Sequence, residues 1–197
     1  TVSAVDKDVR PRNSQFSYSI MHGNDDSAFE IDPNSGSIRA VKSLDRETVE
    51  TYLLTVAATD NGSPPQTGNA NVVVRLSDVN DNPPVLDDFN QLVTIRENSP
   101  PNTLVASLDP LDRDLPPNTG PFKFYLTGGE HKDLFSIDER SGDLRSKASV
   151  DRERTPKLHI LVDIYDSGTP PMMTKYPITV DVSDENDNPS EPRILTI

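Results

Sequence analysis

The sequence contains neither cysteine nor tryptophan, and only three of its 197 residues are histidine. Without cysteine no disulfide bond can form, so a folded secreted domain would depend on its core or on a bound metal. His22, His131 and His159 do not follow a metal-ligand spacing. No nucleophile elbow accompanies them, which disfavours a Ser-His-Asp hydrolase. No apolar run reaches the ~18 residues of a membrane-spanning helix, and no signal peptide is expected.

Basic residues are also scarce: 19 lysines and arginines face 32 acidic residues, which gives a net charge of −13. This balance disfavours a nucleic acid partner, because the phosphates would be repelled. The acidic residues are clustered rather than spread evenly, which is compatible with a cationic ligand. Eighteen prolines and the lack of a sustained 3.6-residue apolar period disfavour long helices.

What the sequence does contain is a repeat with an offset of 106 residues and no net insertion or deletion. Five motifs occur twice: Asp6–Asp8 and Asp112–Asp114, Phe29–Gly36 and Phe135–Gly142, Asp45–Glu47 and Asp151–Glu153, Asp60–Pro65 and Asp166–Pro171, and Asp78–Pro83 and Asp184–Pro189. A fixed period of this kind indicates tandem modules. We predict a first repeat over residues 1–82 that lacks its first strand, a complete repeat over 83–188, and the start of a third over 189–197. The chain is therefore expected to be a fragment of a longer array.

Short β-rich segments bounded by turn residues recur in both modules. The clearest are Tyr52–Ala58 and Val72–Leu76, with Leu158–Ile164 and Ile178–Val182 as their equivalents. Apolar residues alternate with polar ones in Ile178–Val182, which is typical of a half-buried strand. We predict an all-β fold of two tandem Greek-key β-sandwiches. The aromatic residues that recur with the repeat are expected in the cores; they are Tyr18, Phe29, Phe124 and Phe135.

The acidic motifs are predicted to meet where one module follows the other. If the flanking segments are extended, Asp45 and Glu47 share one face and Arg46 takes the other; the same alternation applies to Asp112 and Asp114. Seven carboxylates would then gather at this central junction: Asp45, Glu47, Asp78, Asp81, Asp112, Asp114 and Asp166. Like charges at about 4 Å repel by roughly 1 to 4 kcal/mol per pair.

This donor set predicts calcium. It offers only oxygen, which disfavours zinc and copper, and it is richer in carboxylates than the tight octahedron of magnesium requires. Seven carboxylates exceed the needs of one ion, so more than one is expected. A single acidic turn is usually a solvated loop, but four acidic elements in fixed order, in two copies, argue against that reading. The twelve-residue EF-hand loop is not matched.

The residues Leu44–Glu47, Asp78–Pro84, Arg96–Asn98 and Asp112–Asp114 resemble the signature motifs of cadherin extracellular repeats, and the resemblance covers essentially the whole chain. It implies seven-stranded Greek-key domains in series, with up to three calcium ions at the junction and at least one. It also implies the extracellular part of a plasma-membrane glycoprotein that mediates calcium-dependent, often homophilic, cell–cell adhesion. The partners would be calcium and the same or a related cadherin on an apposed cell, with no nucleic acid and no membrane contact by this fragment.

The resemblance also assigns metal ligands. At the central junction they are Asp45, Glu47, Asp78, Asn80, Asp81, Asn82, Asp112, Asp114, Asn118 and Asp166. An upstream half-site would use Asp6, Asp8, Asn13 and Asp60. A downstream half-site would use Glu97, Asp151, Glu153, Asp184, Asn186 and Asp187. The family's linker also uses a glutamate that would precede Thr1, so the ion nearest the second module, which keeps all its ligands, is expected to bind most tightly.

Two alternatives to direct adhesion remain open. The repeats could be an internal spacer that calcium stiffens, without contacting a partner. They could also be a glycan- or peptide-cleaving sandwich that uses paired carboxylates, although we expect no enzymatic activity. The absence of tryptophan disfavours the tryptophan-anchored strand exchange of the family. Asn61-Gly62-Ser63 is a glycosylation sequon whose use Pro64 should reduce.

Overall fold

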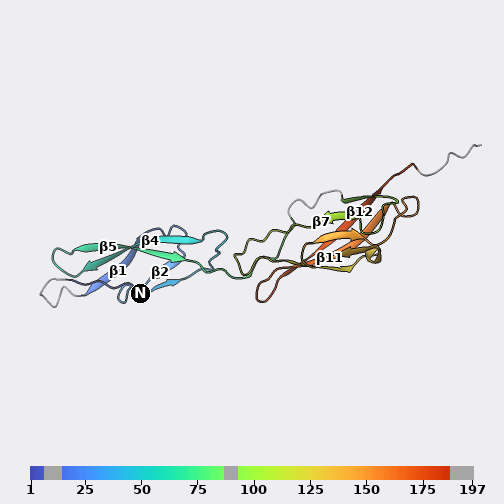
Figure 1. Ribbon diagram of the computed structural model, residues 1–197. Coiled ribbons are helices and arrows are strands. Elements are labelled where there is room, and N and C mark those ends of the chain that lie inside the picture. The colour runs from blue at the N-terminus through green and yellow to red at the C-terminus, as the bar shows by residue number, and fades with distance from the viewer. Residues whose placement is uncertain (7–14, 87–92, 187–197) are drawn as a thin grey trace, which may run out of the picture. The chain divides into compact units, whose positions relative to one another are not determined.

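A computed structural model describes residues 1–6, 15–86 and 93–186. The chain divides into two compact units, unit 1 (Thr1–Asp78) and unit 2 (Val79–Ile197). The repeat bounds of 1–82 and 83–188 stay predictions. The predicted start of a third repeat at 189–197 lies outside the described residues. Strands dominate both units (Figure 1), and the sole helix in the described ranges is the short 3₁₀ turn η1 (Lys132–Leu134). Accordingly, no helix in this part of the chain has the length and apolar character to cross a membrane.

Unit 2 is a sandwich of two sheets. Its described strands are β6 (Val93–Arg96), β7 (Leu104–Ser107), β8 (Lys123–Gly128), β9 (Phe135–Ile137), β10 (Asp143–Ser146), β11 (Lys157–Tyr165) and β12 (Met173–Ser183). One sheet has the order β6-β12-β11-β8 and the other β7-β10-β9. Among the described strands of unit 2, only β6 pairs in parallel, with β12. The buried core includes Phe135, Leu144, Leu158, Ile164 and Ile178. This topology confirms the predicted Greek-key β-sandwich.

Unit 1 repeats part of this plan. Its described strands are β1 (Phe16–His22), β2 (Phe29–Ile31), β3 (Ile38–Ala40), β4 (Thr51–Asp60) and β5 (Thr67–Arg75). They form the sheets β1-β4-β5 and β2-β3. The offset of 106 matches them in order to β8 through β12, whereas β6 and β7 have no counterpart among the described residues of unit 1. The core is correspondingly smaller and is built on Ala28, Phe29, Leu54 and Val56.

The alternating strand pattern is confirmed in β12, where Ile178, Val180 and Val182 are buried. The predicted strands are shorter than the observed ones, because the hairpin ladders continue into polar residues. Thr59 pairs with Thr67 at the end of one hairpin, and Tyr165 pairs with Met173 at the end of the other. The four recurring aromatic residues are buried, as predicted: Tyr18, Phe29, Phe124 and Phe135.

The repeated Phe-x-Ile-Asp-x-x-Ser-Gly motif builds a turn. Asp32 Oδ1 accepts a hydrogen bond from the backbone N–H of Ser35 at 2.7 Å, and Asp138 Oδ1 accepts one from Ser141 at 2.8 Å. In each case this backbone N–H is the main reason that the pKa of the aspartate lies below its usual value. Gly142 follows with φ of 71°, a left-handed conformation that glycine adopts without strain. The recurrence of this motif therefore reflects local folding rather than ligand binding.

Candidate metal-binding clusters

Unit 2 carries acidic clusters at the two ends of its longer sheet. Asp166 directly follows β11, and Asp151–Glu153 precede it. β12 runs antiparallel to β11, so the end of β12 at Ser183 lies beside the start of β11. We call Asn80, Asn82, Asp112, Asp114 and Asp166 the proximal cluster. We call Glu97, Asp151, Glu153 and Asp184 the distal cluster.

Asp166 is a buried carboxylate of the proximal cluster, and only 4% of its surface is exposed. Its Oδ1 accepts backbone hydrogen bonds from Gly168 and Met172, both at 2.9 Å. Its Oδ2 is buried and has no hydrogen-bond partner within the described residues. A buried carboxylate oxygen without a donor is costly, and a bound cation would relieve that cost.

Asn80 presents a second oxygen of this kind. Its Nδ2 donates to the carbonyl oxygen of Pro170 at 2.7 Å, while its Oδ1 is buried and unpartnered among the residues described. The approach depends on Gly168, where a Cβ atom would lie 2.1 Å from Cγ of Asn80. The glycine of the repeated Asp-x-Gly-x-Pro-Pro motif thus makes room for this side chain in unit 2.

Asp112 and Asp114 complete the proximal cluster, but not through alternation along a strand. The backbone N–H of Asp114 donates to Asp112 Oδ1 at 2.9 Å, which closes a bend instead of an extended segment. The prediction of an extended Asp112–Asp114 segment is therefore wrong. Asp114 is buried, and its two carboxylate oxygens accept hydrogen bonds from Asn82, from Nδ2 at 2.7 Å and from the backbone N–H at 3.2 Å.

Two further predicted ligands lie near the proximal cluster in the chain. Asp81 is exposed and accepts a hydrogen bond from Asn82 Nδ2 at 2.8 Å. Asn118 lies in the loop after Asp114, where its backbone N–H donates to the carbonyl of Leu115 at 2.8 Å. Their roles as metal ligands stay predictions.

The distal cluster is centred on Glu97, which is 1% exposed. The backbone N–H groups of Glu185 and Arg152 donate to its two carboxylate oxygens, and that of Glu185 contributes most to holding the pKa of Glu97 below its usual value. Carboxylate oxygens of Glu97, Asp151 and Glu153 lie within 4.8 Å of one another. Asp184 pairs with Arg152 at 3.2 Å. Asn186 is exposed at the end of the described chain, and Asp187 lies outside it.

In unit 1, Asp45 begins a turn that overturns the predicted alternation of Asp45, Arg46 and Glu47. Asp45 Oδ1 accepts the backbone N–H of Glu47 at 2.9 Å, and Oδ2 accepts the hydroxyl of Thr48 at 2.8 Å. The Thr48 hydroxyl is the main cause of the lowered pKa of Asp45. Because the segment turns, Arg46 does not point away from the acids: its Nε lies 2.5 Å from Asp78 Oδ1, and its guanidinium also pairs with Glu47.

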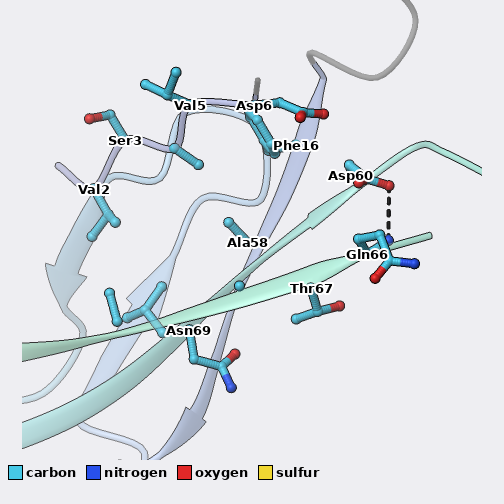
Figure 2. Close-up of a pocket in the computed structure, with 14 residues that line it drawn as sticks. Val2, Ser3, Val5, Asp6, Phe16, Ala58, Asp60, Gln66, Thr67 and Asn69 are labelled. Atoms are coloured by element: carbon cyan, nitrogen blue, oxygen red, sulfur yellow. Dashed lines mark hydrogen bonds between the residues drawn. The ribbon is translucent and has the colours of Figure 1, made fainter. Parts of the chain in front are cut away.

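The upstream half-site is described only in part. Asp6 and Asp60 line a pocket of about 330 Å³ in unit 1 (Figure 2). Asp60 Oδ1 accepts backbone hydrogen bonds from Gly62 at 2.8 Å and Gln66 at 3.0 Å, the same pattern that Asp166 shows in unit 2. The predicted ligands Asp8 and Asn13 lie outside the described residues.

The donors that these clusters offer are carboxylate and amide oxygens, the ligands that calcium prefers. The two unpartnered buried oxygens of the proximal cluster fit that ion as well. The sequence analysis did not predict the close approach of Gly168 and Asn80 or the ion pairs of Arg46. Glycine and arginine recur at the same positions of the repeated motifs, and this recurrence could have indicated both contacts.

Comparison with known proteins decides the family. A family model described as "Cadherin domain" matches residues 1–77 and 91–183. The chain belongs to the cadherin family. This confirms the resemblance drawn from the acidic motifs.

Cadherin relatives match over nearly the whole chain. Mouse Protocadherin Fat 4 is 44% identical over 197 residues, which cover 100% of this chain and 4% of the relative. Mouse Cadherin-23 is 38% identical over 193 residues, which cover 95% of this chain and 6% of the relative. The chain therefore spans only a small part of the curated relatives that it matches.

Solved cadherin structures share the architecture. Protocadherin Gamma B2 extracellular cadherin domains 3-6 match with a TM-score of 0.77 and 27% identity, covering 91% of this chain and 44% of that one. Mouse Cadherin-23 EC22-24 matches with a TM-score of 0.73 and 28% identity, covering 87% of this chain and 54% of that one.

Proposed function

We propose that this chain is a calcium-binding extracellular segment of a larger plasma-membrane cadherin that mediates calcium-dependent cell–cell adhesion. The observation that carries the proposal is the pair of buried, unpartnered oxygens in the proximal cluster, Asn80 Oδ1 and Asp166 Oδ2. A calcium ion would give these two oxygens the positively charged partner that they lack among the described residues. Extracellular calcium modules bind with dissociation constants of about 10⁻⁴ to 10⁻³ M, so the clusters would fill outside the cell and stay empty in the cytosol.

The residues of the chain divide the work of binding. Negative charge would come from Asp112, Asp114 and Asp166, and a neutral oxygen from Asn80. A backbone hydrogen bond holds Asp166 in place, and the absence of a side chain at Gly168 leaves room for Asn80. Glu97, Asp151 and Glu153 would form a second locus at the distal cluster. We propose at least one ion and up to three for the ligands predicted around the link, with Asp81, Asn82 and Asn118 among them.

The link itself is short, which connects binding to mechanics. Asp78, the last residue of unit 1, and Asn80, a proximal-cluster residue of unit 2, are separated by one residue of chain. In the absence of cations, the carboxylates on this segment and beside it repel one another. Cations bound to its ligands would restrict the torsional freedom of the link and stiffen the array. The role is one of binding and mechanics rather than catalysis.

The first test is a calorimetric calcium titration of the wild-type chain beside Asp166→Asn and Asp133→Asn. Asp133 is exposed on η1, near the start of β11 and away from Asp166, so both variants lose one charge but only one loses a proposed ligand. We expect saturable binding in the wild type and in Asp133→Asn, and a loss of at least tenfold in affinity in Asp166→Asn. Equal affinities in all three proteins would contradict the proposal.

Direct adhesion and a spacer role predict different self-association of the chain in the presence of calcium. Sedimentation at millimolar calcium, with a chelator control, separates them. Calcium-dependent dimers support direct homophilic contact by these repeats, whereas a calcium-bound monomer with a narrowed distribution of interdomain distances in small-angle scattering supports the spacer. A monomer whose small-angle scattering profile is the same with and without calcium would contradict the mechanical role.

A further inference from the structure

An arginine and an aspartate at equivalent motif positions lie in ion-pair contact in both units, through different nitrogens of the two arginines. In unit 1, Arg46 Nε lies 2.5 Å from Asp78 Oδ1, and in unit 2, Arg152 Nη1 lies 3.2 Å from Asp184 Oδ1. Both arginines occupy the middle of an Asp-Arg-Glu motif, and both aspartates open an Asp-x-Asn-Asp-Asn-Pro motif, at the common offset of 106. The recurrence of an arginine–aspartate contact at these motif positions indicates a property of the module rather than of one surface.

The pair in unit 1 is enclosed. The side chains of Arg46 and Asp78 are 11% and 14% exposed, and Glu47, the second carboxylate that Arg46 contacts, is 15% exposed. The pair in unit 2 is open, with 44% exposure for Arg152 and 62% for Asp184. An exposed ion pair is weak and is screened by salt. A shielded guanidinium between two carboxylates interacts more strongly, because less water lies between the charges.

Local structure holds Arg46 in place. Asp45 accepts the backbone N–H of Glu47, and the backbone N–H of Val49 donates to the carbonyl of Asp45 at 2.9 Å, so the segment closes into a turn. The turn brings the side chains of Arg46 and Glu47 together, although neighbours in an extended strand would point to opposite faces. The guanidinium stays charged at any physiological pH, so it acts as a permanent cation beside Glu47 and Asp78.

We propose that Arg46 is a built-in counter-cation that competes with calcium for Asp78 and Glu47, and so sets the calcium concentration at which these carboxylates bind the ion. This inference rests on the proposed function, since both carboxylates are predicted calcium ligands. Without calcium, Arg46 neutralises part of the acidic charge and stabilises unit 1. When calcium arrives, a guanidinium so close to a divalent ion is repelled, and Arg46 leaves Asp78. Arg152 does the same for Asp184, with a smaller effect because its pair is open to solvent.

The test compares Arg46→Gln with Arg39→Gln. Arg39 also lies in unit 1, but it pairs with Glu30 on the surface, with 76% of its side chain exposed, so the control has the same charge change away from Asp78. For Arg46→Gln we expect calcium binding that is tighter by roughly three- to tenfold and a lower melting temperature in chelator. For Arg39→Gln we expect calcium affinity and melting temperature close to those of the wild type.

A second readout follows the arginine directly. The ¹⁵N-resolved Nε–H signal of Arg46 should shift during a calcium titration toward the position of a solvated arginine, while that of Arg39 stays in place. Unchanged or weaker calcium binding in Arg46→Gln, or an Arg46 signal that does not move at saturating calcium, overturns the competition while the proposed function stands. No calcium binding by the wild type at millimolar concentration overturns the proposed function and this inference with it.

Discussion

Unit 1 and unit 2 are two versions of one module that differ in how much of the sandwich the described residues form. Unit 2 has two sheets around an extensive core, whereas the described residues of unit 1 contain no counterparts of β6 and β7 and form a smaller core. Even so, Asp60 and Asp166 accept equivalent backbone hydrogen bonds, and so do Asp32 and Asp138. The comparison shows that local hydrogen bonds of the same kind shape the acidic motifs in both units.

The units differ in what surrounds these motifs. Asp166 lies in the same unit as Asn80, whose oxygen completes the proximal cluster, whereas Asp60 lines an open pocket with Asp6. The longer sheet of unit 2 also has charged groups where unit 1 has none: Asp163 and Lys175 stand at the repeat positions of Ala57 and Asn69. Among the described residues, the proximal cluster of unit 2 therefore has more candidate ligands than the upstream half-site of unit 1.

The largest difference between the units should be in the unfolding free energy that is lost when a core phenylalanine is replaced by alanine. Phe135 is fully buried in the larger core, and Phe29 is its counterpart in the smaller one, 5% exposed. We expect Phe135→Ala to cost about 3–5 kcal/mol of unfolding free energy and Phe29→Ala less, because a sparse core leaves a smaller cavity. Urea unfolding followed by circular dichroism measures both, and a greater loss for Phe29→Ala would contradict the ranking.

A buried carboxylate with a partly exposed lysine partner distinguishes the sheet of unit 2. Asp163 is 6% exposed and accepts hydrogen bonds from Thr127 Oγ1 at 2.9 Å and Lys175 Nζ at 3.2 Å. We expect Asp163→Ala to cost about 1–3 kcal/mol because it leaves these donors without their acceptor. Asp181→Ala, which breaks the more exposed pair with Lys157, should cost less than about 1 kcal/mol. Equal losses in thermal unfolding would show that the burial of Asp163 is unimportant.

Substitutions of the two glycines in the Asp-x-Gly-x-Pro-Pro motifs should affect calcium binding differently in the two units. A Cβ at Gly168 would lie 2.1 Å from Cγ of Asn80, whereas one at Gly62 would meet the carboxylate of Asp60 at 2.9 Å. We expect Gly168→Ala to displace Asn80 and weaken calcium binding about tenfold, or about 1.4 kcal/mol. Gly62→Ala should change the proximal affinity little. Calorimetry on both variants checks this, and undiminished affinity in Gly168→Ala would remove Asn80 from the ligand set.

The smallest effect is expected at acidic pH, and it should be alike in the two units. Backbone N–H groups lower the pKa of Asp32 and Asp138, so these turns contribute stability above the unfolded-state pKa of about 3.9. That contribution is lost as the pH falls through the lower, folded-state pKa. A carbon-detected NMR titration below pH 5 should give both carboxyls a pKa below 3.9. A normal value in only one unit would show that its turn does not form.

The sequence was sufficient for the repeat, the all-β sandwich, the buried aromatic residues and the acidic motifs, because these depend on composition and period. It failed where local hydrogen bonding overrides alternation: the side chains of Asp45 and Asp112 bond to backbone N–H groups two residues ahead and bend segments that were expected to be extended. The contact of Asn80 with Gly168 could not be foreseen either, because it joins residues far apart in the chain through close packing. The prediction that Arg46 points away from Asp45 and Glu47 failed for the same reason, because the segment forms a turn.

The most direct test of the account is a crystal structure of the chain grown with millimolar calcium, with anomalous scattering used to locate the ions. We predict an ion within about 2.3–2.6 Å of both Asn80 Oδ1 and Asp166 Oδ2, with oxygens of Asp112 and Asp114 in the same coordination shell. Well-ordered electron density for these side chains with no anomalous peak among them would contradict the claim that the proximal cluster is a calcium site.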